Sequence, residues 1–305
     1  MLTLKPVTEL KSASNQLTRQ RVALGVQYDG SNYFGWQSQV HGQTVQDLLE
    51  AAIKSFMGHS QNEQVRVTTA GRTDTGVHAL GQVVHFDTSI TRPDWSWVRG
   101  INTFLPKDIS VHWAKFVPDT FDSRYSAQER AYAYYLISGA CSPPLIRGKA
   151  GYQMLPEGKS LDIHAMRQGA KYLLGTHDFS SFRSSQCQSK TPIKTLYQME
   201  ILEEGPRVYF LIRGNAFLHH MVRNLVGSLI MVGLGRQSPE WINEVLIAKS
   251  RQIAAPTFSP DGLYLTRVGY PESFEIPEPN FAVSAISANV LINGFGSGNW
   301  IKNEV

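Results

Sequence analysis

The predicted secondary-structure elements of this 305-residue chain occur twice in the same order, and this repeat limits the possible folds more than any other feature. Each half alternates strand-like runs and amphipathic helices as β-α-β-β-α-β. The first half has predicted strands at 21–28, 65–69, 82–88 and 109–117 and predicted helices at 44–57 and 94–104. The second has predicted strands at 130–138, 193–203, 208–216 and 263–268, predicted helices at 161–174 and 217–232, and a further helix from residue 238. This order predicts an α+β fold of two ferredoxin-like halves whose antiparallel sheets meet at a central catalytic cleft.

The repeat also sets the expected domain organisation. The predicted segments are a flexible leader at 1–20, a first half at 21–118, a second half at 119–270 and an extended tail at 271–305. The leader is rich in Ser, Asn, Gln, Thr and Lys, a composition that disfavours a packed core. Pro271, Pro277 and Pro279 interrupt regular structure in the tail.

Composition favours a cytoplasmic protein, and the net charge permits a polyanionic partner. Four acids and one base lie beyond residue 270, which leaves 28 bases and 21 acids, or +7, in residues 1–270. No apolar run approaches the roughly 20 residues that span a bilayer, so no membrane contact is expected. The N-terminus lacks the apolar stretch of a secretory signal. The two cysteines, Cys141 and Cys187, fit a reducing compartment.

Residues 70–79, Ala-Gly-Arg-Thr-Asp-Thr-Gly-Val-His-Ala, form a predicted loop that combines one carboxylate with one guanidinium and two glycines. Glycines let a backbone turn sharply and approach a ligand. Arg72 can orient the carboxylate of Asp74 or bind a phosphate beside it. An isolated Asp-x-Gly is more often a tight turn whose Asp bonds its own backbone. The complete ten-residue string favours a loop that presents Asp74 for chemistry.

Two further side chains are candidates for the same site. Tyr132 lies on a predicted strand, where it could stack on a base or transfer a proton, or could simply fill the core of the sheet. Arg223 lies one residue off the apolar stripe of the predicted helix 217–232, where it could reach inward to a carboxylate or face solvent. The residues alone leave both alternatives open.

The remaining polar candidates are less specific. His219 and His220 would project about 100° apart on a helix, and the H-E-x-x-H spacing of a zinc site is absent, so no metal site is predicted. The loop 177–183 either packs locally or brings Arg183 toward a phosphate backbone.

Taken in order along the chain, these motifs resemble those of the bacterial tRNA pseudouridine synthase A family. The resemblance covers about residues 21–270. It is carried by residues 28–31 (Tyr-Asp-Gly-Ser), 35–37 (Gly-Trp-Gln), 71–74 (Gly-Arg-Thr-Asp), 81–86, 130–132, 177–183, 217–223 and 262–265. Each string alone is a weak signal, whereas the ordered set is specific.

The resemblance implies a homodimeric, cofactor-free enzyme that isomerises uridine to pseudouridine at positions 38, 39 and 40 of the tRNA anticodon stem-loop. By match of motif, Asp74 is the catalytic aspartate, Tyr132 the active-site tyrosine and Arg223 the ion-pair partner of Asp74. Arg72 is expected to hold the flipped nucleotide. Leu263 matches a pocket-lining leucine.

Two other functions remain alternatives on sequence grounds. Asp74-Thr75-Gly76 is also the aspartic-protease tripeptide, but that chemistry needs two carboxylates that share a proton, and the chain has no second Asp-Thr-Gly or Asp-Ser-Gly. A catalytically inactive RNA-binding module of the same fold would keep the basic surface. The intact set of Asp74, Tyr132 and Arg223 favours an enzyme.

Overall fold

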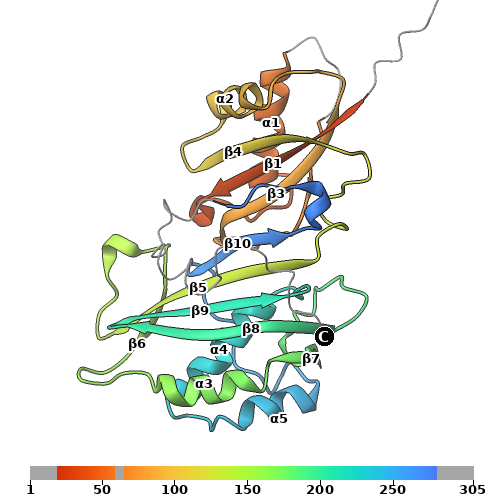
Figure 1. Cartoon of the computed structure of the whole chain (residues 1–305). Helices are drawn as coiled ribbons and strands as arrows, with labels where there is room; N and C mark the ends of the chain where they lie inside the picture. The colour runs from red at the N-terminus through yellow and green to blue at the C-terminus, as the bar shows by residue number, and fades with distance from the viewer. Residues whose placement is uncertain (1–18, 59–64, 280–305) are drawn as a thin grey trace, which may run out of the picture.

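Strands from both halves of the chain join into one sheet (Figure 1). The computed structural model describes residues 19–58 and 65–279, so nearly all of the predicted leader and most of the predicted tail lie outside the described residues. The order along the described sheet is β4-β1-β3-β10-β5-β9-β8-β7, with β2 paired to β3 and β6 paired to β5. The strands are β1 (Gln20–Tyr28), β2 (Thr68–Thr69), β3 (His78–Thr88), β4 (Ile109–Val117), β5 (Glu129–Gly139), β6 (Gly151–Met154), β7 (Gly175–Asp178), β8 (Ile193–Glu204), β9 (Arg207–Gly214) and β10 (Leu263–Gly269).

The two halves have the same strand order in the sheet. In the second half, β10, β5, β9 and β8 are neighbours in that order, and in the first half β4, β1 and β3 are neighbours with the short β2 beyond them. The halves join where β10 pairs in parallel with β3, Tyr264 opposite His78 and Leu265 opposite Ala79. The other pairs along this path are antiparallel. The predicted α+β fold with joined antiparallel sheets is confirmed.

The helices pack on one face of this sheet. They are α1 (Val45–Met57), α2 (Asp94–Phe104), α3 (Ile163–Lys171), α4 (Met221–Gly233) and α5 (Trp241–Ala248). Apolar side chains from all five share one core with the strands, and a second buried cluster, on alternate strand positions such as Ala131 and Ala133, includes no residue of these helices. In Figure 1, α1 and α2 lie over the first half and α3, α4 and α5 over the second. No helix in the described residues is long and apolar enough to cross a membrane.

Local signals set some element boundaries and fail at others. The Thr44 side chain accepts from the Asp47 N–H, so α1 begins where the predicted cap places it. The helix predicted at 217–232 begins only at Met221, because His220 adopts a left-handed conformation with φ 63°. The strand predicted from residue 82 begins at 78, and the one predicted at 65–69 is reduced to two residues.

The first residues of the predicted tail return to the body of the protein. The Phe274 and Phe121 rings pack together, with ring centroids 5.2 Å apart. Lys115 Nζ lies 2.9 Å from a carboxylate oxygen of Glu275. Arg267 pairs with Glu278. Glu275 and Glu278 therefore neutralise bases of the sheet.

Candidate active site

The loop that carries Asp74 leads directly into β3 and is held by side chains and backbone of the first half. The hydroxyls of Tyr28 and Thr73 lie 2.8 Å apart, and the Gln82 amide donates to the Gly71 carbonyl at 2.7 Å. The Trp36 N–H donates to the Thr73 carbonyl at 3.0 Å. These hydrogen bonds hold the loop, so it presents the Asp74 side chain in a fixed direction.

Glycines are required at two points around this loop. Gly76 has φ +79°, and the Val77 N–H donates across it to the Asp74 carbonyl at 3.1 Å, which makes a tight turn. On the neighbouring segment, a Cβ at Gly30 would lie 2.0 Å from the Val77 carbonyl oxygen. The backbone of residue 30 therefore fits against the loop only without a side chain.

Three side chains at or just before the start of α4 surround the Asp74 carboxylate. His219 Nε2 lies 3.1 Å from Oδ1, Arg223 Nη1 lies 3.0 Å from Oδ2, and His220 Nε2 lies 3.4 Å from Oδ2. Arg223 is itself fixed, since its Nε–H donates to the Phe258 carbonyl at 2.8 Å. The sequence-predicted pairing of Arg223 with Asp74 is present in the structure.

Asp74 is ionised although only 20% of its side chain is exposed. Burial acts to raise the pKa of this carboxyl group, but the hydrogen bond from His219, the charges of both histidines and the hydrogen bond from Arg223 outweigh it, so the pKa lies below its ordinary value. The position at the N-terminus of α4 adds in the same direction, because the helix macrodipole favours a negative charge there. Burial lowers the pKa of His220 more than Asp74 raises it.

Tyr132 and Leu263 lie on adjacent strands, on the face of the sheet that carries the helices. Tyr132 lies opposite Leu265 in the β5–β10 register, and Leu263 is two residues before Leu265 on β10. Side chains two residues apart on a strand point to the same face, so Tyr132 and Leu263 both point to the face with the helices. The Tyr132 ring packs edge-on against the Phe217 ring, with ring centroids 5.0 Å apart. Burial raises the pKa of its hydroxyl to about 12, so the group is protonated at neutral pH.

The two other sequence-predicted arginines differ in their surroundings. Arg72 is exposed, and its Nη1 lies 3.3 Å from Gln188 Oε1, so the loops of the two halves meet through it. The Nη2 of Arg183 donates to the carbonyls of Cys187 at 2.7 Å and Ser189 at 2.8 Å, which fixes its guanidinium in its own loop. The structure thus brings Asp74 and Arg223 into direct contact but shows no such contact for Arg72 or Arg183.

Both halves of the chain match a known protein family. A family model described as tRNA pseudouridine synthase matches residues 25–126 and again 170–271. The chain belongs to this family. The tRNA pseudouridine synthase A of Polynucleobacter asymbioticus is 58% identical over 89% of this chain and 99% of that protein. Those of Ralstonia nicotianae and Paraburkholderia xenovorans are 54% and 56% identical over 84% and 85% of this chain and 92% and 93% of those proteins.

Within this tRNA pseudouridine synthase family member, three residues at the site were not assigned a role from sequence. His219 and His220 lie in the 217–223 motif and Arg130 in the 130–132 motif, but the sequence tests the histidines only as metal ligands and gives Arg130 no role. Arg130 donates from Nη2 to the Ala70 carbonyl at 3.0 Å and so ties β5 to the catalytic loop. The signal in the sequence is the His-His pair in the first turn of the predicted helix 217–232, but its contacts with Asp74 depend on the left-handed His220, which periodicity does not reveal.

The same histidines raise the question of a metal. The ligand atoms of Asp74, His219 and His220 lie within 4.8 Å of one another. The helical spacing used to predict no metal site is wrong, because both histidines precede α4. Arg223 contacts the same carboxylate, however, and its positive charge opposes a second cation there. The absence of a metal stays a prediction, now on electrostatic grounds.

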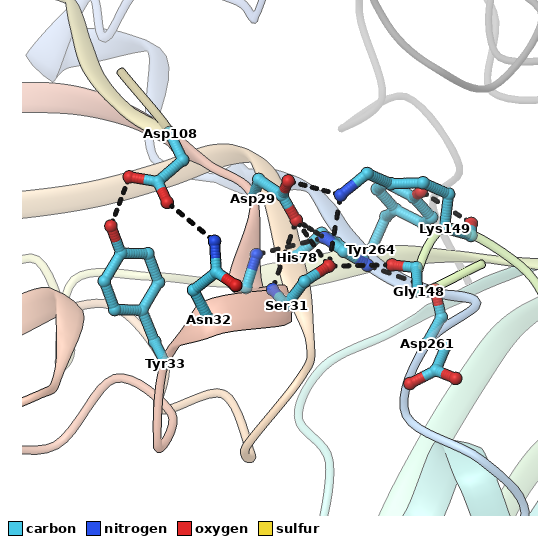
Figure 2. Close-up of polar contacts among 11 residues, drawn as sticks. Asp29, Ser31, Asn32, Tyr33, His78, Asp108, Gly148, Lys149, Asp261 and Tyr264 are labelled. Atoms are coloured by element: carbon cyan, nitrogen blue, oxygen red, sulfur yellow. Dashed lines mark hydrogen bonds and ion pairs between the residues drawn. The ribbon is translucent and has the colours of Figure 1, made fainter. Parts of the chain in front are cut away.

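A second polar network adjoins the catalytic loop and links the halves (Figure 2). Asp29, just after β1, pairs with Lys149 of the second half and lies 3.1 Å from Nδ1 of His78, the first residue of β3. The Ser31 hydroxyl donates to Asp29 at 2.8 Å. His78 stacks on Tyr264 of β10, with ring centroids 4.5 Å apart. These contacts fix the end of the loop four residues after Asp74.

Proposed function

We propose that this protein isomerises uridine to pseudouridine in the anticodon stem-loop of tRNA, at positions 38, 39 and 40, without a metal or cofactor. The observation that carries the proposal is the buried, ionised Asp74, which is held by Arg223 and two histidines on the same face of the sheet as Tyr132. Membership of the tRNA pseudouridine synthase family supports the reaction class.

The reaction explains why the site needs an ionised carboxylate. A C–N glycosidic bond breaks, the uracil turns, and C5 bonds to the same sugar carbon, so no electrons are gained or lost overall. Bond cleavage develops positive charge on the sugar, as in glycoside hydrolysis, where a carboxylate stabilises or traps that charge. Either role requires Asp74 to be charged before substrate arrives, and its lowered pKa meets that requirement.

The surrounding residues divide the remaining tasks. Arg223 holds Asp74 in its ionised form. Tyr132 offers a flat ring to the uracil and assists loss of the C5 proton, which is released to solvent water. Leu263 lines the same pocket. The exposed Arg72 fills the space left when the target nucleotide leaves its helix, and Arg183 contributes to backbone binding.

We further propose a homodimer in the cytoplasm, as the family resemblance implies. Both cysteines, Cys141 and Cys187, are free thiols, which fits a reducing compartment. The alternative, an inactive RNA-binding module of the same fold, would retain tRNA binding but has no need of an ionised, buried Asp74.

Tritium release tests the proposal directly. Anticodon stem-loop transcripts that carry 5-tritiated uridine should lose tritium with the wild type and with Asp119→Asn, an exposed carboxylate away from the site. Asp74→Asn should fold and bind RNA normally but reduce release at least about 10⁴-fold, because its neutral amide cannot stabilise the developing charge. Near-normal release by Asp74→Asn would refute the proposal, and no release by the wild type despite tight binding would favour the inactive module.

A further inference from the structure

A polar cavity of about 390 Å³ opens next to the catalytic cluster. Its lining includes Arg183, Ser184, Ser185, His220, Arg251 and Thr257. His220 belongs both to this cavity and to the Asp74 site, since its Nε2 lies 3.4 Å from the Asp74 carboxylate. The cavity and the carboxylate are therefore separated by one imidazole ring.

The lining of this cavity is cationic and has no carboxylate. Two guanidinium groups, one imidazole and several hydroxyls face it. Neither Arg183 nor Arg251 forms an ion pair with any carboxylate in the described residues, although both are partly buried. Burial, with no acidic partner to oppose it, lowers the pKa of Arg251. A partly buried cation is stabilised by an anion, so the cavity is suited to binding one.

Both guanidinium groups are held in place before any ligand binds. Arg251 donates from Nη2 to Asn224 Oδ1 and to Thr257 Oγ1, each at 3.1 Å, and from Nη1 to the Ala254 carbonyl at 3.2 Å. Arg183 donates from Nη2 to two carbonyls of its own loop. These bonds fix the planes of the two side chains. Nε of Arg251 has no protein acceptor in the described part of the chain, whereas Arg183 also contacts the Cys187 thiol. Fixed forked donors match the oxygens of a phosphate.

We propose that this cavity binds a backbone phosphate of the RNA adjacent to the target uridine, with Arg251 as a substrate-binding residue. The proposal rests on the proposed function, because it is the ribose at Asp74 that brings a phosphate next to His220. Each ribose in an RNA chain has a phosphate on either side, so a nucleotide whose sugar contacts Asp74 must place one within reach. The contact recognises the backbone and not the base, so one pocket serves several neighbouring positions.

A phosphate-by-phosphate binding experiment tests this assignment. Anticodon stem-loop RNAs would be compared in pairs, one with a neutral methylphosphonate linkage at one position near the target uridine and one with the normal phosphate there. Both RNAs of a pair would carry a 2′-O-methyl group at that nucleotide to prevent strand cleavage. Dissociation constants would be measured for the wild type, for Arg251→Gln and for Arg236→Gln. Arg236 is the matched control, an exposed arginine after the C-terminal end of α4, opposite the end that contacts Asp74.

One linkage should weaken wild-type binding about tenfold, the usual size of a charged hydrogen bond. At that linkage Arg251→Gln should show no further loss, so that the two changes together cost no more than either alone. At every linkage, the losses in binding free energy from Arg236→Gln and from the methylphosphonate should add. The slope of log Kd against log salt should fall by about 0.7–0.9 in Arg251→Gln, as expected for the loss of one phosphate contact. Additive effects at every linkage, with an unchanged salt slope, would overturn the proposal.

A second variant separates binding from folding. Ser185 is exposed and its side chain makes no hydrogen bond in the described residues, so Ser185→Asp should leave the melting temperature unchanged while it places a negative charge in the cavity. We expect it to weaken RNA binding at least about tenfold and to abolish the methylphosphonate effect; unaltered binding would count against the pocket. Inorganic phosphate could raise the melting temperature of the wild type while every methylphosphonate effect stays additive with Arg251→Gln. In that case the cavity binds small anions only, and the RNA assignment is wrong.

The two proposals can fail separately. Tritium release from unmodified stem-loop RNA by the wild type tests isomerisation alone. Release without coupling at any linkage would refute the phosphate pocket and leave the proposed function intact. Coupling without release would retain an RNA phosphate site and refute the isomerase.

Discussion

Asp74 keeps its charge in a largely buried position because three neighbouring side chains, all from residues 219–223, supply hydrogen bonds or positive charge. An unpaired carboxylate at such a depth would take up a proton. Arg223 is the least exposed of the three, at 14%, and it is fixed by the Phe258 carbonyl. The pKa of Asp74 therefore depends on residues from the other half of the chain.

Removing Arg223 should move the acid limb of the reaction. In Arg223→Gln the carboxylate loses the hydrogen bond from the guanidinium while its burial is unchanged, so the pKa of Asp74 should rise. Single-turnover tritium release measured between pH 4 and 8 should then decline at a higher pH than in the wild type, because less of Asp74 is ionised. The Arg236→Gln control should keep the wild-type profile, and an unshifted limb in Arg223→Gln would contradict the assigned role.

His219 should affect turnover more than binding. Its Nε2 lies 3.1 Å from Asp74 Oδ1, so His219→Ala removes one hydrogen bond to a charged group, about 1.5–3 kcal/mol. We expect kcat to fall about 10- to 100-fold while the dissociation constant for RNA changes less than about twofold. His219→Gln, whose amide can still donate, should recover part of the loss. Equal losses in binding and turnover would show that His219 contacts RNA instead.

At the scale of elements, the sequence predicts what local signals determine. Helix α2 and strand β4 have the predicted bounds, and α1 begins after its Thr44 cap. The start of α4 is different, because the left-handed His220 is held by tertiary contacts that no helical periodicity encodes. The pairing of Arg223 with Asp74 follows from the family motif, whereas the contacts of His219 and His220 with Asp74 appear only in the structure. Both histidines lie close to Asp74 in space but far from it in sequence, so no local pattern links them.

The turn at η1 (Gly30–Asn32) should be intolerant of a side chain. In Gly30→Ala the new Cβ would lie 2.0 Å from the Val77 carbonyl oxygen, so the catalytic loop must shift. Overpacking of this kind costs about 1–3 kcal/mol, a loss of several degrees in melting temperature for a chain of this size, and kcat should fall at least about tenfold. Gly139→Ala is the matched control, since no atom of the described residues lies within 4 Å of its Cβ, and it should change neither quantity. Normal turnover in Gly30→Ala would show that the loop tolerates displacement.

For the whole molecule, the geometry of the site depends on how the two halves are joined. Asp74 comes from the first half and its three partners from the second, yet β3 and β10 pair through only two residue pairs. Side chains add to this junction through Arg130 at the Ala70 carbonyl and through the Asp29 network. A loosened junction would separate charges that the site holds within about one hydrogen-bond length.

Asp29→Asn should weaken this junction in a pH-dependent way. The contact with His78, and after it those with Lys149 and Ser31, lower the pKa of Asp29 despite partial burial. Its stabilisation is therefore fully present above the unfolded value of about 3.9 and is lost as pH falls below it. Urea unfolding at pH 7 should show Asp29→Asn less stable than the wild type by about 1 kcal/mol, a modest figure because solvent screens this partly exposed group. The difference should persist at pH 5 and shrink below about pH 4, whereas Asp119→Asn should match the wild type throughout. A difference that grows as the pH falls would mean that Asp29 does not act through its charge.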